Sequence, residues 1–245
     1  MPVSIVTGGT RGLGAAISRR LGRDGHRVAA VYRTDDAAAA AFEAAAAAEG
    51  VEVSVHRADL GDPGDVRTVV TEVVDRWGPV LHVVNNHGVL QEGRVGDLTA
   101  ELWDDTFAVN VRGAFLLTQA LWPAMESARY GRVVNVGSVT AVMGNPKQIA
   151  YGASKAALVG LTRSLARAGA RKGITVNCVV PGVYDTDMTR AMSERDQEAI
   201  AGMIPVGRRG RPEELAHVVA MLMHPDAAYL TGAVLQVDGG LGMGA

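Results

Sequence analysis

A tyrosine and a lysine four residues apart, Tyr151 and Lys155, form the pair with the clearest chemical use in this sequence. On a helix such residues lie on one face, one turn apart, so a phenol stands beside an ammonium group. A phenol titrates near pH 10, and acid–base work near neutrality needs a pKa about three units lower, or about 4 kcal/mol of preference for phenolate. A neighbouring ammonium favours that charged form. The pair predicts a proton donor or acceptor.

Two polar residues stand where they can assist that chemistry. Ser138 follows the apolar run 132–137, at the carboxyl end of an expected strand, where ligands bind in open α/β sheets. Its hydroxyl can hold a substrate oxygen by a hydrogen bond. Asn110 lies in the middle of a helical stretch, where asparagine is locally unfavourable. A Tyr-x-x-x-Lys spacing alone is common on helices, and Ser138 favours the catalytic interpretation.

A glycine-rich turn, Thr7-Gly-Gly-Thr-Arg-Gly-Leu-Gly14, joins the first expected strand to a helix. Glycines allow a tight turn and let backbone N–H groups approach phosphate oxygens, and the helix N-terminus favours negative charge. A strand–turn–helix context supports a dinucleotide site, whereas a tight turn without a ligand is the alternative. The expected contacts are Gly8, Thr10, Arg11, Gly12, Leu13 and Gly14.

The end of the second expected strand indicates which dinucleotide binds. An NAD site usually carries an acidic residue there, but this strand ends in Tyr32-Arg33-Thr34. With Arg11 and Thr10 from the glycine loop, two guanidinium groups and two hydroxyls suit a 2′-phosphate. We expect NADP, whose oxidised nicotinamide would also favour the phenolate form of the catalytic tyrosine. The alternative is that both arginines are merely solvated.

Two further strand ends offer cofactor contacts. Asp59 and Leu60 follow the third strand, where a short polar side chain can meet the adenine edge or simply cap a helix. Asn86 and Gly88 follow the fourth strand and can support the cofactor ribose or form only a turn. His87 between them is bulky for that place.

Strand-like and helix-like segments alternate along the whole chain, which predicts a single-domain α/β fold, a Rossmann-like doubly wound parallel sheet of about seven strands covering residues 1–245. The expected strands are Val3–Thr7, Arg27–Tyr32, Val51–His56, Leu81–Asn85, Arg132–Gly137, Thr175–Val179 and Ala233–Val237. The expected helices are Gly12–Arg23, Asp36–Glu49, Pro63–Trp77, Ala100–Arg129, Tyr151–Lys172 and Pro212–Met223. The poorly patterned stretch 184–205, with Met188, Met192 and Met203, could be a substrate lid.

Composition excludes several classes of protein. A net charge of −2 gives no basic excess for nucleic acid, and no apolar run is long enough to span a membrane. The start of the chain lacks the pattern of a signal peptide, and the single cysteine, Cys178, cannot form an internal disulfide, so we expect a cytoplasmic protein. No metal site is expected, because the histidines show no ligand spacing: His26, His56, His82, His87, His217 and His224.

Taken together, these motifs resemble the short-chain dehydrogenase/reductase family over essentially the whole chain. The resemblance rests on the glycine loop, Asn-Asn-x-Gly at 85–88, Asn110, Ser138, Tyr151, Lys155 and Pro181-Gly182. It implies that Tyr151 is the acid/base, that Ser138 polarises the carbonyl, and that Lys155 lowers the tyrosine pKa and binds the nicotinamide ribose. It implies that Asn110 holds a relay water and that Thr186 bonds the carboxamide. Pro181, Gly182 and Val183 are further expected cofactor contacts, as are Tyr151 and Lys155.

Within the family the chain is most similar to bacterial 3-oxoacyl-acyl-carrier-protein reductases, notably in 137–145, 171–177, 186–190 and 237–243. This resemblance implies an NADPH-dependent homotetramer that reduces a 3-oxoacyl thioester in fatty-acid or polyketide biosynthesis. Arg129 and Lys172 match the carrier-docking positions, although both can equally be helix-end cations favoured by the dipole. His87 replaces the usual alanine of the Asn-Asn-Ala-Gly segment. Tyr184 is larger than expected and could mark a different substrate, such as an aromatic or polyketide carbonyl.

The sequence leaves other functions open. A polyketide tailoring ketoreductase shares the chemistry and differs in substrate, and an NAD(P)-linked alcohol or sugar dehydrogenase would run toward oxidation. A dinucleotide-sensing protein is the non-enzymatic alternative, although a sensor would not need Tyr151 or Lys155.

Overall fold

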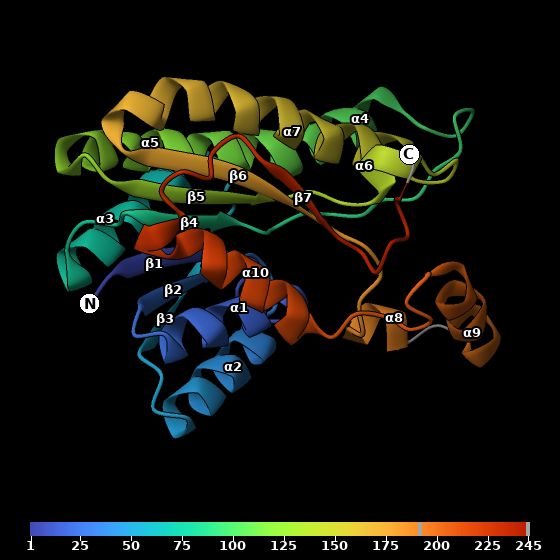
Figure 1. Ribbon diagram of the computed structural model, residues 1–245, viewed down its shortest axis with the longest axis horizontal. Helices are drawn as coiled ribbons and strands as arrows, with labels where there is room; N and C mark the ends of the chain where they lie inside the picture. The colour runs from blue at the N-terminus through green and yellow to red at the C-terminus, as the bar shows by residue number, and fades with distance from the viewer. Residues whose placement is uncertain (191–192, 244–245) are drawn as a thin grey trace.

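The computed structural model describes residues 1–190 and 193–243. A parallel sheet of seven strands, in the order β3-β2-β1-β4-β5-β6-β7, lies between helices (Figure 1). The strands are β1 (Val3–Thr7), β2 (Arg27–Tyr32), β3 (Val53–Arg57), β4 (His82–Asn85), β5 (Gly131–Val136), β6 (Ile174–Pro181) and β7 (Val234–Val237). The helices are α1 (Gly12–Arg23), α2 (Asp36–Ala48), α3 (Pro63–Trp77), α4 (Ala100–Phe107), α5 (Gly113–Ala128), α6 (Thr140–Met143), α7 (Ile149–Gly169), α8 (Asp187–Arg190), α9 (Glu194–Met203) and α10 (Pro212–Met223).

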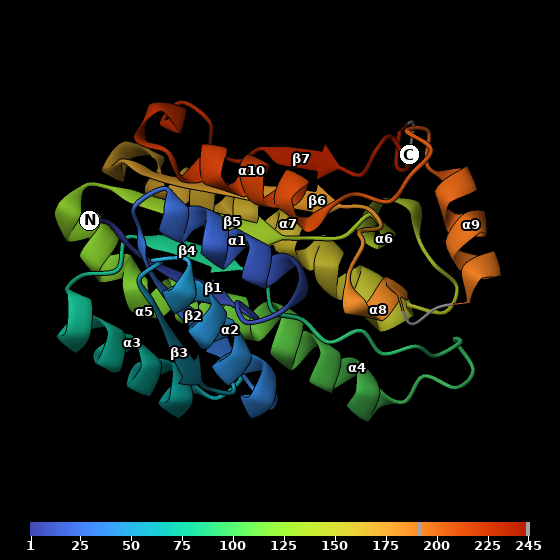
Figure 2. The same cartoon turned by 90° about the horizontal axis from the view of Figure 1, so that it is seen from below.

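The sheet is buried on both faces because helices cover each side. One apolar cluster joins the central strands to α3 and α5, and a second joins them to α1 and α10. Figure 2 shows the same layers from below, with α1 and α10 side by side. Strands β1, β4, β5 and β6 are fully buried, as expected for a parallel sheet covered on both faces. The predicted doubly wound α/β fold is confirmed.

The strand order reverses between β1 and β4, and this reversal places the functional residues. Chain connections run outward on both sides of this point, so their loops leave a crevice at the carboxyl ends of the strands. Thr7, Asn85, Val136 and Pro181 end their strands at this edge. The functional site is therefore expected at this edge of the sheet.

The expected helix Ala100–Arg129 is one helical run but not one regular α-helix. A π-helical turn, Ala108–Arg112, separates α4 from α5, with Asn110 in its middle. Such turns insert an extra residue into the helix and are frequent at functional sites. The run ends at Arg129, whose φ of 47° is left-handed. The sequence signal was the asparagine itself, a poor choice for a regular helix interior.

The large Tyr184 side chain, which could have marked a different substrate, has a packing role in the structure. The residue is buried, and its hydroxyl donates to the Val237 carbonyl at 2.6 Å. Its ring lies so close to Gly210 that an added Cβ there would stand 2.7 Å from it. Tyr184 belongs to the apolar cluster with α1 and α10. Its size therefore reflects packing and says nothing about the carbonyl substrate.

The stretch 184–205, expected to be a lid, contains the two short helices α8 and α9. Figure 1 shows them projecting from the body of the fold beyond the end of α10. Ser193 caps α9, accepting a hydrogen bond from the Asp196 N–H at 3.2 Å. Ala191 and Met192, which fall within the expected lid, lie outside the described residues. Within the described part of the chain, no helix combines the length and apolar character needed to cross a membrane.

Candidate active site

The glycine loop has the shape of a phosphate cradle. Gly8 and Gly12 have φ values of 60° and 52°, which favour glycine, and a Cβ on Gly14 would stand 1.9 Å from the Gly8 carbonyl oxygen. Helix α1 begins after Arg11 with no side-chain cap on its first N–H groups. Those N–H groups still need acceptors, and phosphate oxygens satisfy them while the helix dipole favours the charge. The loop therefore fits a dinucleotide pyrophosphate.

Arginines gather at the ends of β2 and β3 beside that loop. Arg33 is exposed, and Arg11 lies 3.5 Å from a carboxylate oxygen of Asp35. Arg57 pairs with Tyr32 across the sheet and donates its Nε hydrogen to the Arg33 carbonyl at 3.2 Å. Arg57 was not predicted from the sequence, although a cation ending the strand next to β2 was a usable signal. These guanidinium groups suit a 2′-phosphate better than a bare ribose hydroxyl.

The third strand leads into a small cavity of 480 Å³ that Arg33 and Asp59 both line. Asp59 accepts a hydrogen bond from the Gly61 N–H at 2.9 Å, and Asp62, not Asp59, caps α3. Helix capping is therefore not the role of Asp59. The Leu60 side chain is buried in the apolar core, so any contact of this residue with a cofactor would use its backbone.

Asn86 and Gly88 lie between the glycine loop and the Lys155 amine. The Asn86 amide donates to the carbonyls of Thr7 and Gly8, at 2.9 and 3.3 Å. A Cβ on Gly88 would stand 3.1 Å from the Lys155 Nζ, so a larger residue would press on the amine. The segment is thus more than a turn: it fixes the phosphate loop on one side and leaves room for the lysine on the other.

Ser138, Tyr151 and Lys155 meet at the carboxyl end of β5. The Lys155 ammonium lies 5.9 Å from the Tyr151 ring centroid and donates to the Val136 carbonyl at 2.9 Å. Burial lowers the pKa of Lys155 from 10.5 to about 8. Ser138 is also buried, and its hydroxyl acts on the Tyr151 phenol by lowering the pKa of that phenol. The three side chains predicted from spacing are therefore together.

The expected lowering of the Tyr151 pKa is not found in the protein alone. Burial raises the pKa of this phenol, and the hydrogen bond from Ser138 offsets only part of that effect. The physical reason is that desolvation penalises phenolate more than the neighbouring groups stabilise it. A phenol that stays protonated is suited to giving a proton.

Three hydrogen bonds to protein groups hold the Asn110 side chain. Its Oδ1 accepts from the Val89 N–H at 2.8 Å, and its Nδ2 donates to the Val89 carbonyl and to the Ser154 hydroxyl, at 3.1 and 2.9 Å. Ser154 in turn donates to the Tyr151 carbonyl at 2.7 Å. Asn110 therefore ties the segment after β4 to the first turn of α7. Ser154, which was not predicted from the sequence, carries that link.

The segment after β6 returns across the glycine loop. A Cβ on Gly182 would stand 2.8 Å from Asp238, so the chain passes close to the loop after β7. Thr186 reaches within 3.8 Å of the position that a Cβ on Gly12 would take. Pro181 and Val183 flank the same turn. These expected cofactor contacts thus lie opposite the phosphate loop.

Arg129 and Lys172 lie far from this site within one chain. Arg129 follows α5 at the amino end of β5 and donates to the Arg171 carbonyl at 3.2 Å, and Lys172 pairs with Glu126. Helix α7, with 21 residues, spans about 30 Å between Tyr151 near its start and Lys172 beyond its end. The two cations therefore cannot border the reacting groups of their own chain.

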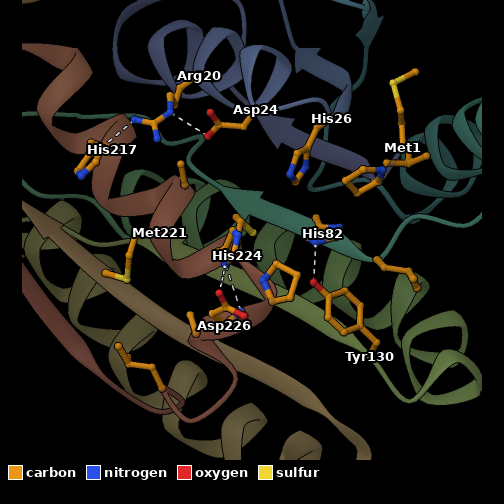
Figure 3. Close-up of a pocket in the computed structure, with 18 of the residues that line it drawn as sticks. Met1, Arg20, Asp24, His26, His82, Tyr130, His217, Met221, His224 and Asp226 are labelled. Atoms are coloured by element: carbon orange, nitrogen blue, oxygen red, sulfur yellow. Dashed lines mark hydrogen bonds and ion pairs between the residues drawn. The ribbon is translucent and has the colours of Figure 1, made fainter.

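A cavity of 1350 Å³ opens at the opposite, amino edge of the sheet (Figure 3). His82 at the start of β4 faces the Tyr130 hydroxyl at 3.2 Å, and Arg20 at the end of α1 bonds His217 on α10 at 2.8 Å. None of the expected catalytic side chains lines it, so size alone does not identify the active site. Within the described ranges, no group of three or more His, Cys, Asp or Glu could hold a metal ion.

A glycine cradle at the β1–β4 reversal, with a protonated phenol, a serine and a buried amine beside it, defines a dinucleotide-dependent oxidoreductase. The family model described as Enoyl-(Acyl carrier protein) reductase matches residues 8–242. The chain belongs to the short-chain dehydrogenase/reductase family.

Relatives of named activity cover nearly the whole chain. It is 41% identical to the 3-oxoacyl-[acyl-carrier-protein] reductase FabG of Pseudomonas aeruginosa, over 98% of this chain and 97% of that protein. It is 40% identical to the 3-oxoacyl-[acyl-carrier-protein] reductase MabA of Mycobacterium bovis, over 98% and 92%. A variant of actinorhodin polyketide ketoreductase, solved with NADPH, superposes with a TM-score of 0.95 at 36% identity, over 99% and 97% of the two chains.

Proposed function

We propose that this protein is an NADPH-dependent ketoreductase that reduces a 3-oxoacyl thioester, linked to acyl carrier protein or coenzyme A, to the 3-hydroxyacyl product. The observation that carries the proposal is the meeting of Tyr151, the buried Ser138 and the buried Lys155 amine at the carboxyl end of β5. The arginines at the ends of β2 and β3 support NADPH, as does the NADPH with which the actinorhodin ketoreductase variant was solved. The relatives FabG and MabA, both 3-oxoacyl-[acyl-carrier-protein] reductases, support the thioester substrate.

In this proposal, Ser138, Tyr151 and Lys155 have different roles in ketone reduction. Ser138 holds the carbonyl oxygen by a hydrogen bond, and Tyr151 gives that oxygen its proton as negative charge develops. Lys155 stabilises the resulting phenolate, because an ammonium about one helical turn away favours it. Bound NADPH supplies the hydride. The protein's task is to keep the phenol protonated and aimed at the oxygen.

Further residues take supporting roles in this proposal. Asn110 holds a water that passes protons to Lys155, and Thr186 bonds the nicotinamide carboxamide. Arg129 and Lys172 dock the carrier protein for a site on another copy within a cytoplasmic homotetramer, since about 30 Å of helix separates them from their own site.

NADPH oxidation in the presence of acetoacetyl-coenzyme A tests the proposal. We expect turnover by the wild-type chain, and its absence with both acetoacetyl and longer thioesters would contradict the thioester substrate. Turnover of polyketide-like or simple sugar carbonyls alone would favour the tailoring or sugar-dehydrogenase alternatives. Cofactor binding without turnover of any carbonyl would favour a dinucleotide sensor.

Arg33→Asp tests the basis of the cofactor preference. Replacing the guanidinium with a carboxylate removes a charge-assisted contact and adds repulsion, so KM for NADPH should rise about tenfold or more. KM for NADH should change much less. The matched control is Arg27→Asp at the other end of β2, where Arg27 pairs with Glu52. Equal effects on both cofactors would contradict a 2′-phosphate role for Arg33.

The pH dependence of reduction should report Lys155. Its pKa of about 8 means that the ammonium is present below pH 8 and is lost as the pH rises through that value. The rate kcat should therefore fall above pH 8, whereas Tyr151, with its raised pKa, stays protonated there. Lys155→Met should lower kcat and abolish this limb of the profile. An unchanged limb in that variant would assign the titration to another group.

A further inference from the structure

His87, the residue that replaces the usual alanine after Asn86, uses both of its ring nitrogens. Nδ1 lies 2.7 Å from the Thr7 hydroxyl at the carboxyl end of β1, and Nε2 lies 2.9 Å from the Val109 carbonyl oxygen. Its own carbonyl accepts from the Lys155 ammonium at 3.4 Å. One residue therefore touches the base of the phosphate loop, the π-turn and the catalytic lysine.

The π-turn explains why the Val109 carbonyl needs this partner. In a regular α-helix, the Gly113 N–H would bond the carbonyl four residues back, on Val109. Here the Gly113 N–H donates to Ala108, five residues back. The imidazole N–H of His87 satisfies the Val109 oxygen instead. Gly113 also makes room for the ring, because a Cβ there would stand 2.7 Å from Nε2.

These partners allow one consistent direction for the hydrogen bonds. A carbonyl oxygen can only accept, so Nε2 carries the hydrogen and Nδ1 of the neutral ring must accept. The single Thr7 hydroxyl hydrogen can reach the Val84 carbonyl at 3.2 Å or Nδ1 at 2.7 Å, and the shorter contact assigns it to Nδ1. The Thr7 hydroxyl oxygen accepts from the backbone N–H groups of Asn86 and His87, at 2.9 and 3.1 Å. An uninterrupted chain of hydrogen bonds thus runs from the end of β4 through Thr7 and the imidazole to the π-turn.

We propose that His87 is a positioning residue that locks the phosphate loop to the π-turn of Asn110 and so fixes the backbone on which the Lys155 amine rests. Its effect on turnover rests on the proposed ketoreductase function. The hydrogen bonds themselves do not. In a chain with alanine at this position, the Val109 carbonyl would need another partner, so the histidine is a feature of this chain's own active site.

The surroundings of the His87 ring keep it neutral, as the proposed hydrogen bonds to Thr7 and Val109 require. Burial first, and then the Lys155 ammonium, lowers the pKa of His87 to about 4. Arg33 also lowers this pKa, whereas the hydrogen bond to the Val109 carbonyl and the Asp59 carboxylate raise it. At neutral pH the ring therefore holds a single hydrogen, and Val109 determines which nitrogen carries it.

Imidazole nitrogen NMR of the full chain tests the lock without an activity assay. We expect His87, assigned by comparison with His87→Phe, to show a protonated Nε2 and an unprotonated Nδ1 at pH 7. Addition of NADPH should not change this tautomer. The opposite tautomer, or an average of the two, would overturn the proposal even if the protein proves to be a ketoreductase.

Kinetics of two His87 variants separate hydrogen bonding from space filling. His87→Phe keeps a ring of similar size, and His87→Ala introduces the residue that is usual in the family. Folding of both variants is checked first. Each should lower kcat about tenfold, as expected for a small misplacement of reacting groups. The pH 8 limb that reports Lys155 should move to higher pH, because a looser segment admits water to the amine. A merely structural role would lower thermal stability without moving that limb.

The matched control uses a histidine that contacts the other end of β1, the strand that contains Thr7. The Ser4 hydroxyl lies 2.7 Å from Nδ1 of His26, so His26→Phe breaks a similar contact far from the site. We expect its kcat and pH profile to match the wild type. Wild-type kinetics in His87→Phe, or an equal loss in His26→Phe, would overturn the proposal. If the wild type reduces no thioester, the proposed function fails, while the NMR result still decides the role of His87.

Discussion

Replacing Tyr151 with phenylalanine should reduce kcat for thioester reduction by about a thousandfold, because the site loses its only assigned proton donor to the carbonyl oxygen. Desolvation raises the pKa of this phenol, so it is protonated at neutral pH and ready to give its hydrogen. Ser138 would remain to hold the oxygen but would lose its hydroxyl neighbour. Steady-state NADPH oxidation with saturating acetoacetyl thioester measures the loss.

The same substitution at Tyr229, which is fully exposed, is the control. Tyr229→Phe should keep wild-type kcat and wild-type NADPH affinity. A Tyr151→Phe enzyme that kept a tenth or more of wild-type kcat would contradict the assignment. A variant that lost NADPH binding as well would place Tyr151 in cofactor binding more than in proton transfer.

Replacing Arg132 with leucine should lower the free energy of unfolding by about 2–3 kcal/mol, the scale for losing the hydrogen bonds of a buried charged donor. Arg132 is 2% exposed. Its guanidinium donates to the carbonyls of Gly131, Gly173 and Pro225, at 3.0, 3.3 and 3.1 Å, and lies 4.3 Å from the Tyr130 ring centroid. Leucine would leave these carbonyls without their donor.

Urea unfolding followed by circular dichroism measures this change. Arg23→Leu is the control, because Arg23 is 60% exposed and pairs with Glu49 on the surface, where ion pairs contribute about 0–1 kcal/mol. Arg132→Lys should fall between wild type and Arg132→Leu, since it keeps a charge but loses the planar fork. Equal stability of Arg132→Leu and Arg23→Leu would show that the buried guanidinium contributes little.

Local patterns in the sequence were enough to predict the seven strands, the long helices between them and the side chains proposed for catalysis. Alternating apolar runs and helical stretches reflect local periodicity, and the turn at Gly8–Gly14 reflects local backbone freedom. The four-residue spacing of Tyr151 and Lys155 also acts within one helical turn. Signals of this kind need no knowledge of distant contacts, so they can be recovered before the chain is folded.

The solvation and the contacts of each group, in contrast, could be learned only from the folded chain. From the sequence, the size of Tyr184 could have marked a different substrate, but its ring packs against Gly210. The pKa of Tyr151 rises because packed neighbours exclude water from the phenol. His87 bonds Thr7 and Val109, residues 80 and 22 positions away. Burial and long-range hydrogen bonds depend on segments that meet only when the sheet is complete. Candidate reactive side chains can therefore be proposed from local spacing, whereas their electrostatic setting depends on the whole fold.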